Sequence, residues 1–387
     1  MAKEKMRRRP LEEGNQNVTG GDTPTEVVSP YLHHYEDRIE SPLTGEVLHR
    51  DDPLFAAVDR QPGSRMPDHG PRLSAADFRR LLTGGFLIED AIATSHRSRL
   101  LYASIETCTT CNHRCAFCPV SVDPRSREVM PQELFMRIVD EVIEAGVPGV
   151  SVFLNNYNEP TVDPLFLDRL RVLFGKGVPT AILTNASHLP PEKIETIRGM
   201  GRLRYLGVNL PTTGPARYRE MHGTTDLPRI LANIDYAIAH PLAEENAFVV
   251  LGYGDERHDF DLAEIERRYA ASGWTAKKFV VQSRAGLVGT SHLLPYVERL
   301  GGCEQTGSRP LQHLHVVTSG RAIFCCQDYY ERYPVGDLRR QSVREVLASP
   351  ELARLRRWAY GVEDAPDDFI CRRCEFALER KQVPPKS

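Results

Sequence analysis

Short apolar segments alternate with amphipathic segments of helical period from about residue 100 to residue 282, and this alternation restricts the available folds more than any other feature. Short links join the segments, so each strand and the helix after it form a β/α unit, and successive strands lie parallel with the helices outside. Right-handed crossovers curl such a sheet, which predicts an α/β fold, a partial (β/α)6 TIM barrel. We predict strands at residues 100–107, 149–154, 179–184, 204–210, 247–252 and 278–282, and helices at residues 131–145, 164–174, 192–198, 227–239 and 262–271.

Three cysteines follow the first predicted strand. Cys111, Cys115 and Cys118 lie in the run CNHRCAFCP. Barrel folds carry their chemistry at the carboxyl ends of the strands, which is where this loop falls. Three thiolates can hold a 4Fe–4S cluster, and because full coordination needs four, one iron stays open to another ligand.

A structural zinc site is the alternative for this loop. Zinc prefers four ligands in paired spacings. Cys108 with Cys111, and Cys115 with Cys118, supply that number, and His113 is a further candidate ligand. A structural zinc site has no reason to lie at the end of a barrel strand, so we favour the cluster.

Composition narrows the class of protein. The chain has 387 residues, of which 41% are hydrophobic and 26% charged, with a formal net charge of −3. We therefore expect a globular protein of more than one domain, with neither a nucleic acid nor a membrane as partner. Nine cysteines are an odd number and no apolar secretory segment opens the chain, so we expect reduced thiols and a cytoplasmic location.

The cysteine triplet resembles the radical S-adenosylmethionine (SAM) superfamily. The resemblance implies that SAM binds the open iron through its amino and carboxylate groups. An electron donor such as flavodoxin or ferredoxin then reduces the cluster, and SAM is cleaved to methionine and a 5′-deoxyadenosyl radical that abstracts hydrogen from a C–H bond. After the second strand, Tyr157, Asn158, Glu159 and Pro160 resemble the family's G-G-E-P motif, with both glycines replaced, which implies that Glu159 holds the SAM amine.

Other strand ends carry polar residues that match the family by position. Thr184 and Asn185 follow the third strand and Asn209 ends the fourth, which implies contacts with the SAM ribose and carboxylate. Phe117 matches the position beside the adenine. Arg284, after the last strand, is a candidate contact to the SAM carboxylate or to the substrate.

The remaining cysteines follow the barrel. Residues 311–318 and 321–325 predict a β-hairpin and residues 342–348 a helix. This order resembles the auxiliary-cluster domains called SPASM and twitch, which implies a second 4Fe–4S cluster; a zinc site is the alternative. Cys326 points away from its neighbour if both lie on a strand. The predicted ligands are Cys303, Cys325, Cys371 and Cys374.

The chain divides into five predicted regions: a disordered tail (1–30), a lead-in (31–99), the barrel (100–290), the auxiliary cluster domain (291–380) and a C-terminal tail (381–387). In the lead-in, Ser74 is a candidate N-cap of a helix that ends at Gly84 and Gly85. This helix, a short strand at residues 86–90 and the acidic residues nearby vaguely resemble leader-peptide recognition domains. A packing extension of the barrel is the simpler interpretation.

For the reaction, we expect oxidation of a sugar or aminocyclitol, with the auxiliary cluster as electron acceptor. Arg284, Asp328 and His315 are candidate bases, and Cys326 or Cys108 is the candidate hydrogen donor of an epimerase. The alternatives are a ribosomal-peptide maturase that cross-links or epimerises, a redox-neutral sugar epimerase, and an iron–sulfur or zinc protein without catalysis. The sequence gives no prediction of oligomeric state.

Overall fold

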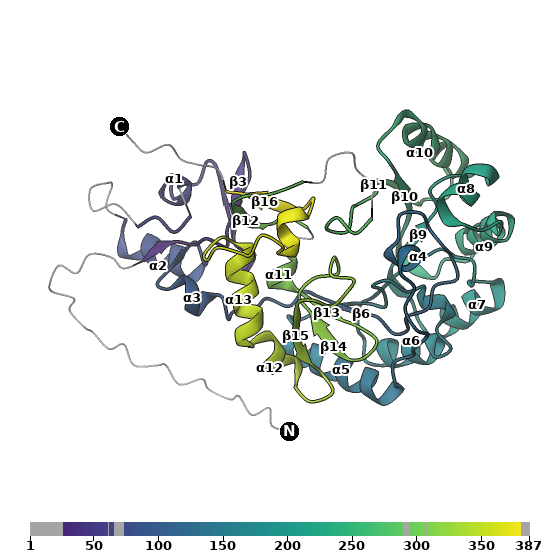
Figure 1. Ribbon diagram of the computed structural model, residues 1–387, viewed down its shortest axis with the longest axis horizontal. Coiled ribbons are helices and arrows are strands. Elements are labelled where there is room, and N and C mark those ends of the chain that lie inside the picture. Colours follow the sequence, from purple (N-terminus) through teal and green to yellow (C-terminus); the bar gives the residue numbers. More distant parts are fainter. Residues whose placement is uncertain (1–25, 61, 66–72, 289–294, 306–307, 381–387) are drawn as a thin grey trace, which may run out of the picture.

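A nine-stranded sheet organises the protein (Figure 1). The computed structural model describes residues 26–60, 62–65, 73–288, 295–305 and 308–380. The sheet order is β11-β10-β9-β8-β7-β6-β13-β14-β15, and β6 to β11 pair in parallel. The parallel strands are β6 (Tyr102–Ile105), β7 (Ser151–Phe153), β8 (Thr180–Thr184), β9 (Leu203–Asn209), β10 (Ala243–Gly252) and β11 (Thr275–Val280). The predicted partial (β/α)6 barrel is therefore confirmed.

The helices between these strands cover the outer side of the sheet, as the teal part of Figure 1 shows. Helix α5 buries Phe135, Ile138 and Val142 along one face, as its helical period predicts. Helix α10 begins earlier than predicted, because Asp255 caps it and its first turns are too polar to show an apolar pattern. These helices are α5 (Gln132–Ala145), α6 (Phe166–Gly175), α7 (Pro191–Met200), α9 (Leu227–Ala239) and α10 (Glu256–Arg268). The sequence pattern did not predict α8 (Pro215–His222).

The sheet continues beyond the barrel into the C-terminal region. β13 (His313–Val316) pairs in parallel with β6, and β14 (Arg321–Ile323) and β15 (Pro334–Asp337) extend the sheet in antiparallel pairing. The predicted hairpin is confirmed as β13 and β14, but β14 ends before Cys325. The Cys111–Cys118 loop and the Cys325–Cys326 turn therefore follow strands of the same sheet.

Short elements complete the C-terminal region. Its helices are α11 (Arg309–Gln312), α12 (Val343–Leu347), α13 (Pro350–Ala359) and η2 (Ile370–Arg373), and β12 (Leu300–Cys303) pairs with β16 (Ala377–Glu379). α12 confirms the predicted helix and begins with a capping box between Ser342 and Glu345. The sequence pattern did not predict α13, β12, β15 or β16, most of which are too short for a periodic signal.

The N-terminal region folds around a core of its own. Three antiparallel strands, in the order β2-β3-β4, pack with helices into a cluster that buries Val28, Ile39, Leu48, Val58 and Leu81. The elements are β1 (Val27–Val28), β2 (His33–His34), β3 (Arg38–Glu40), β4 (Val47–His49), α1 (Phe55–Val58), α2 (Ala75–Thr83), β5 (Leu87–Ile88) and α3 (Ala91–Thr94). Ser74 caps α2 as predicted. The predicted tails lie outside the described residues, apart from residues 26–30, which contain β1.

This region packs on the C-terminal region, as the purple and yellow elements of Figure 1 show. The rings of Tyr31 and Tyr360 are 5.0 Å apart. Arg356, on α13, donates hydrogen bonds to the carbonyls of Ser95 and Arg97. In the part of the chain that the structure describes, no helix combines the length and apolar character that a bilayer crossing requires.

Candidate active site between two cysteine loops

The first cysteine loop leaves the carboxyl end of β6 and is held by the end of α8. The backbone N–H of Arg114 donates to the carbonyl of His222 (3.1 Å), and that of Ala116 donates to the carbonyl of Met221 (2.9 Å). Burial, followed by the nearby Glu159 carboxylate, raises the pKa of Cys111 to about 12. Thiols in this state are protonated at neutral pH, so binding of a metal cluster would release protons.

A different metal-ligand set overlaps this loop. The ligand atoms of His113, Cys115 and His222 lie within 4.8 Å of one another. Cys108, Cys111 and Cys118 do not belong to this set. Cys108 is fully buried, and burial raises the pKa of its thiol to about 11, as expected of a packed small side chain.

Glu159 is fixed beneath the loop by four donors. Its Oε1 accepts from the hydroxyls of Thr161 and Thr184 (both 2.6 Å) and from the Thr161 N–H, and its Oε2 accepts from the Asn185 N–H (2.7 Å). Burial raises the pKa of this carboxyl, and these hydrogen bonds lower it. The donors leave a lone pair of Oε2 for an ammonium group, so the predicted role of Glu159 fits the geometry.

The other motif residues have clear structural contacts. The Asn158 side chain accepts from the Asn156 N–H and donates to the Leu154 carbonyl, so it shapes the turn after β7. Tyr157 is buried, and its hydroxyl donates to the Cys326 carbonyl in the C-terminal region. Tyr157 also forms a buried cluster with Val120 and Tyr329 against which Cys118 packs, so this cluster connects the Cys111–Cys118 loop with the turn that carries Cys326.

The predicted ribose and adenine residues differ in their contacts. Asn185 donates to Asn112 in the cysteine loop (3.0 Å), which joins the end of β8 to that loop. Oδ1 of Asn209 is buried and, among the described residues, has no hydrogen-bond partner, as expected of a group that awaits a ligand. Phe117 is buried against Met221 and Val281. The Thr184 hydroxyl already donates a hydrogen bond to the Glu159 carboxylate.

Arg284 lies between the Cys111–Cys118 loop and the turn that carries Cys325 and Cys326. Its guanidinium is 5.7 Å from the ring centre of Tyr157. It lowers the pKa of Cys118 on one side and of Cys326 on the other, although burial and closer partners act more strongly on both thiols. Arg284 and Ala285 both have positive φ (54° and 55°), a strained conformation typical of functional sites.

The auxiliary cysteines converge in the C-terminal region. Burial raises the pKa of the Cys303, Cys371 and Cys374 thiols; Cys374 and Cys303 add to this effect at Cys371, Cys303 adds to it at Cys374, and Cys326 adds to it at Cys303. Cys325 and Cys326 lie in the turn beyond β14, and both thiols are within 4.8 Å of a ring nitrogen of His315. The prediction that Cys326 points away from Cys325 is therefore wrong, because no strand alternation applies there. The choice of Cys325 as the ligand stays a prediction.

The candidate bases Asp328 and His315 are both buried, and burial raises the pKa of Asp328. Both carboxylate oxygens of Asp328 accept backbone N–H groups, from Arg332 (3.0 Å) and Tyr333 (2.7 Å), so Asp328 holds a turn. His315 is buried, and burial holds its pKa well below the usual range. Neither of its ring nitrogens has a hydrogen-bond partner in the described part of the chain.

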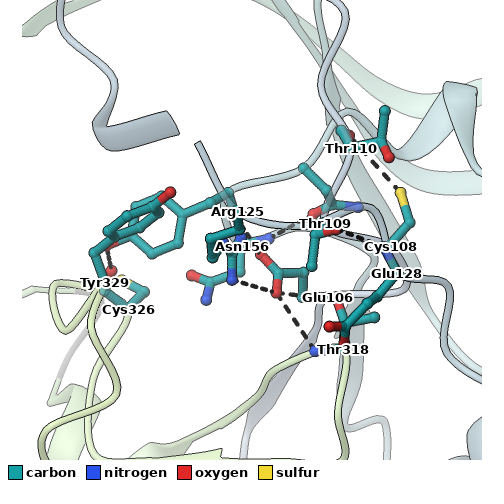
Figure 2. Close-up of polar contacts among 12 residues, drawn as sticks. Glu106, Cys108, Thr109, Thr110, Arg125, Glu128, Asn156, Thr318, Cys326 and Tyr329 are labelled. Carbon is teal, nitrogen blue, oxygen red and sulfur yellow. Dashed lines mark hydrogen bonds and ion pairs between the residues drawn. The ribbon is translucent and has the colours of Figure 1, made fainter. Parts of the chain in front are cut away.

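Sequence analysis missed a buried network centred on Glu106 (Figure 2). The Glu106 carboxylate accepts two hydrogen bonds from Arg125 (2.5 and 3.0 Å), and others from the Thr318 hydroxyl and the Tyr157 N–H. A polar pocket of about 210 Å³ lies beside it. Because Glu106 directly follows β6, its position at a barrel strand end was a usable signal. Asn156, with both amide atoms buried and unpaired among the described residues, had no such signal.

Two protein-family models match the chain. The model described as the radical SAM superfamily matches residues 105–264, and the SPASM model, described as an iron–sulfur cluster-binding domain, matches residues 303–375. The first match contains the Cys111–Cys118 loop and Glu159. The second contains the five C-terminal cysteines.

Curated relatives match over part of their length. The tungsten-containing aldehyde ferredoxin oxidoreductase cofactor-modifying protein of Pyrococcus furiosus is 28% identical over 100 residues, which are 26% of this chain and 28% of that protein. The GTP 3′,8-cyclase of Alkaliphilus oremlandii is 23% identical over 162 residues, 41% of this chain and 50% of that protein. The chain thus spans half or less of the length of these relatives.

Solved structures share the fold. SuiB of Streptococcus suis, bound to precursor peptide SuiA, has a TM-score of 0.56 at 12% identity and covers 90% of this chain and 93% of its own. The structure of anSMEcpe with bound AdoMet has a TM-score of 0.51 at 12% identity and covers 71% of this chain and 83% of its own.

The two domains imply three cofactors, namely a 4Fe–4S cluster, SAM and an auxiliary cluster. The residues present fit this set, because Cys111, Cys115 and Cys118 share one loop and the C-terminal cysteines converge around unpaired buried polar groups. The chain therefore carries a radical SAM domain at residues 105–264 and a SPASM domain at residues 303–375.

Proposed function

We propose that this radical SAM enzyme carries out a two-electron oxidation at a C–H bond of a peptide. When bound, the clusters and SAM supply the radical that removes hydrogen and the acceptor for the remaining electron. The chain contributes the surroundings: Glu159 holds the SAM amine, Phe117 packs beside the adenine, and Asn209 offers its free Oδ1 to the ligand.

The arrangement of the two cysteine loops supports oxidation over a redox-neutral reaction. Tyr157 connects the loops, and Arg284 lies between them. A substrate bound at this place would have the Cys111–Cys118 loop on one side and the auxiliary cysteines on the other. The groups that these cysteines would hold would supply the radical that takes one hydrogen atom and the acceptor for the electron left on the substrate, and loss of one proton would complete the oxidation.

The N-terminal region is the observation that favours a peptide. Sequence analysis favoured a sugar or aminocyclitol because no convincing peptide-recognition domain was apparent. Residues 26–99 nevertheless form a three-stranded sheet with helices and a separate core. β2 and β4 are the edges of this sheet, and an extended peptide can pair with a sheet edge. The likeness to SuiB, which was solved with a precursor peptide, covers 90% of this chain and supports the same proposal.

A sugar or aminocyclitol remains the competing substrate class, and epimerisation the competing reaction. For epimerisation, Cys326 is better placed than Cys108, which is fully buried and hydrogen-bonds to the Thr110 carbonyl. An epimerised product keeps the mass of its substrate, whereas an oxidised product is about 2 Da lighter.

The test uses anaerobic protein reconstituted with iron and sulfide, then treated with dithionite and SAM. We expect 5′-deoxyadenosine, and we expect its formation to increase with members of a peptide panel that lose two hydrogen atoms each. The matched control carries alanine at Cys111, Cys115 and Cys118 and should form none. Stimulation by the sugar panel alone would reject the peptide proposal, and product of unchanged mass would reject oxidation.

A further inference from the structure

Arg309 places a partly buried positive charge among the auxiliary cysteines. Its Nε and Nη1 atoms are closed from solvent and have no hydrogen-bond partner among the described residues. Burial alone lowers the pKa of this guanidinium, and the neighbouring cysteines, Cys326, Cys325, Cys303 and Cys374, raise it above its usual range. Arg309 is therefore a cation whose neighbours are thiols.

A buried guanidinium without an anionic partner is strongly unfavourable. Elsewhere in this chain, buried arginines are satisfied: Arg169 pairs with Asp163, and Arg356 donates to backbone carbonyls. Because no described carboxylate takes that role for Arg309, the geometry suits an anion held by the cysteines themselves. A 4Fe–4S cluster with four thiolate ligands carries net negative charge and meets this requirement.

Arg309 is the main positive charge on this side of the cysteines. It acts on Cys303, Cys325, Cys326 and Cys374, and at Cys326 it acts more strongly than Arg284. The backbone N–H groups of Gln305 and Arg309 approach the Cys303 sulfur. Arg284 contributes a second, weaker positive influence at Cys326, and it also lies near the first cysteine loop.

We propose that Arg309 is the charge-compensating residue of the auxiliary cluster and holds its reduction potential above the value that the cysteines alone would give. One-electron reduction adds a negative charge to the cluster and needs no proton, because an arginine stays protonated throughout. A nearby cation stabilises the reduced state more than the oxidised state. Arg309 thereby makes the cluster a better acceptor for an electron from the substrate.

This inference depends on the auxiliary cluster and not on the substrate proposed above. The experiment therefore uses the full chain without substrate. Alanine at Cys111, Cys115 and Cys118 leaves one cluster to observe, and a potentiometric titration with dithionite, followed by electron paramagnetic resonance, measures its midpoint potential. Arg309→Met removes the charge at similar length, and Arg309→Lys retains it.

Arg373 provides the matched control. It lies next to Cys374 in the chain, but its side chain is exposed, so its charge is screened by water. We expect Arg309→Met to shift the midpoint potential to a lower value, Arg309→Lys to restore most of the shift, and Arg373→Met to leave the potential unchanged.

Iron content separates a tuning role from a structural one. A normal iron content with an unchanged potential in Arg309→Met would overturn the proposal. If Arg309→Met loses the cluster while Arg309→Lys keeps it, the positive charge is required and the proposal is supported. Loss of the cluster in both variants would mean that the shape of Arg309 matters and its charge does not, and would reject the proposal. None of these outcomes depends on turnover.

Discussion

Replacement of Arg125 by methionine tests whether the Glu106 network holds the two cysteine regions together. Glu106 is completely buried and the Arg125 side chain is 19% exposed, so the substitution leaves a carboxylate without its cation. Breaking a buried ion pair costs about 3–5 kcal/mol. The hydrogen bonds from Thr318 and Tyr157 remain and offset part of this cost, so we expect a loss near the lower end, about 3 kcal/mol.

The assay is urea unfolding of the cluster-free protein under reducing conditions. With an m value of about 3 kcal/mol/M, the midpoint should fall by about 1 M. The double variant Glu106→Gln, Arg125→Met removes both charges and should recover about 2 kcal/mol of the loss. Arg198→Met is the control, because Arg198 pairs with Glu195 on the surface and should contribute less than about 1 kcal/mol.

Two results would refute this reasoning. A loss below about 1 kcal/mol in Arg125→Met would mean that water reaches Glu106 and screens its charge. Simple additivity of the two substitutions in the double variant would mean that the carboxylate and the guanidinium do not act as a pair.

Two further predictions concern SAM binding and pH. Glu159→Gln removes the charge that is predicted to face the SAM amine. A hydrogen bond to a charged group contributes about 1.5–3 kcal/mol, so we expect SAM to bind at least about tenfold more weakly. Calorimetry on reconstituted protein measures this affinity. The exposed Glu128→Gln should not change the affinity, and equal affinities in all three proteins would exclude Glu159 as the amine partner. Burial lowers the pKa of His33 from 6.5 to about 4, so the unfolded chain binds a proton that the folded chain does not. The contribution of this group to stability is complete above about pH 6.5 and declines as the pH falls. When the pH is lowered from 7.5 to 5, the free energy of unfolding of His33→Phe should therefore fall by about 2 kcal/mol less than that of the parent. Parallel pH curves for the two proteins would contradict the burial argument.

Local patterns predicted the barrel because each unit carries its own signal. The period of α5 and the capping residue of α12 can be recognised within one short segment. The boundary of α10 was placed too late because its first turns are polar. β2, β3 and β4 have two or three residues each, and their pairing depends on the core that they share, which no short segment displays.

The same limit applies to the site. The triplet Cys111, Cys115 and Cys118 is visible because its ligands are close in sequence. Thr318 reaches Glu106 from 212 positions along the chain, and Arg309 meets Cys374 only in the folded protein. Such groups have no spacing that sequence analysis can detect. The error at Cys326 had a different origin, because the alternation of strand side chains was applied to a turn.

The parallel pairing of β6 with β13 affects how the chain is made. During synthesis, β6 leaves the ribosome about two hundred residues before β13, its neighbour in the sheet. One edge of the incomplete barrel therefore stays unpaired for much of translation. An open, apolar strand edge invites pairing with other chains. The C-terminal region therefore protects the barrel from aggregation as well as binding a cluster, and a nascent chain that stops after β11 would carry the first cysteine loop on an unprotected sheet.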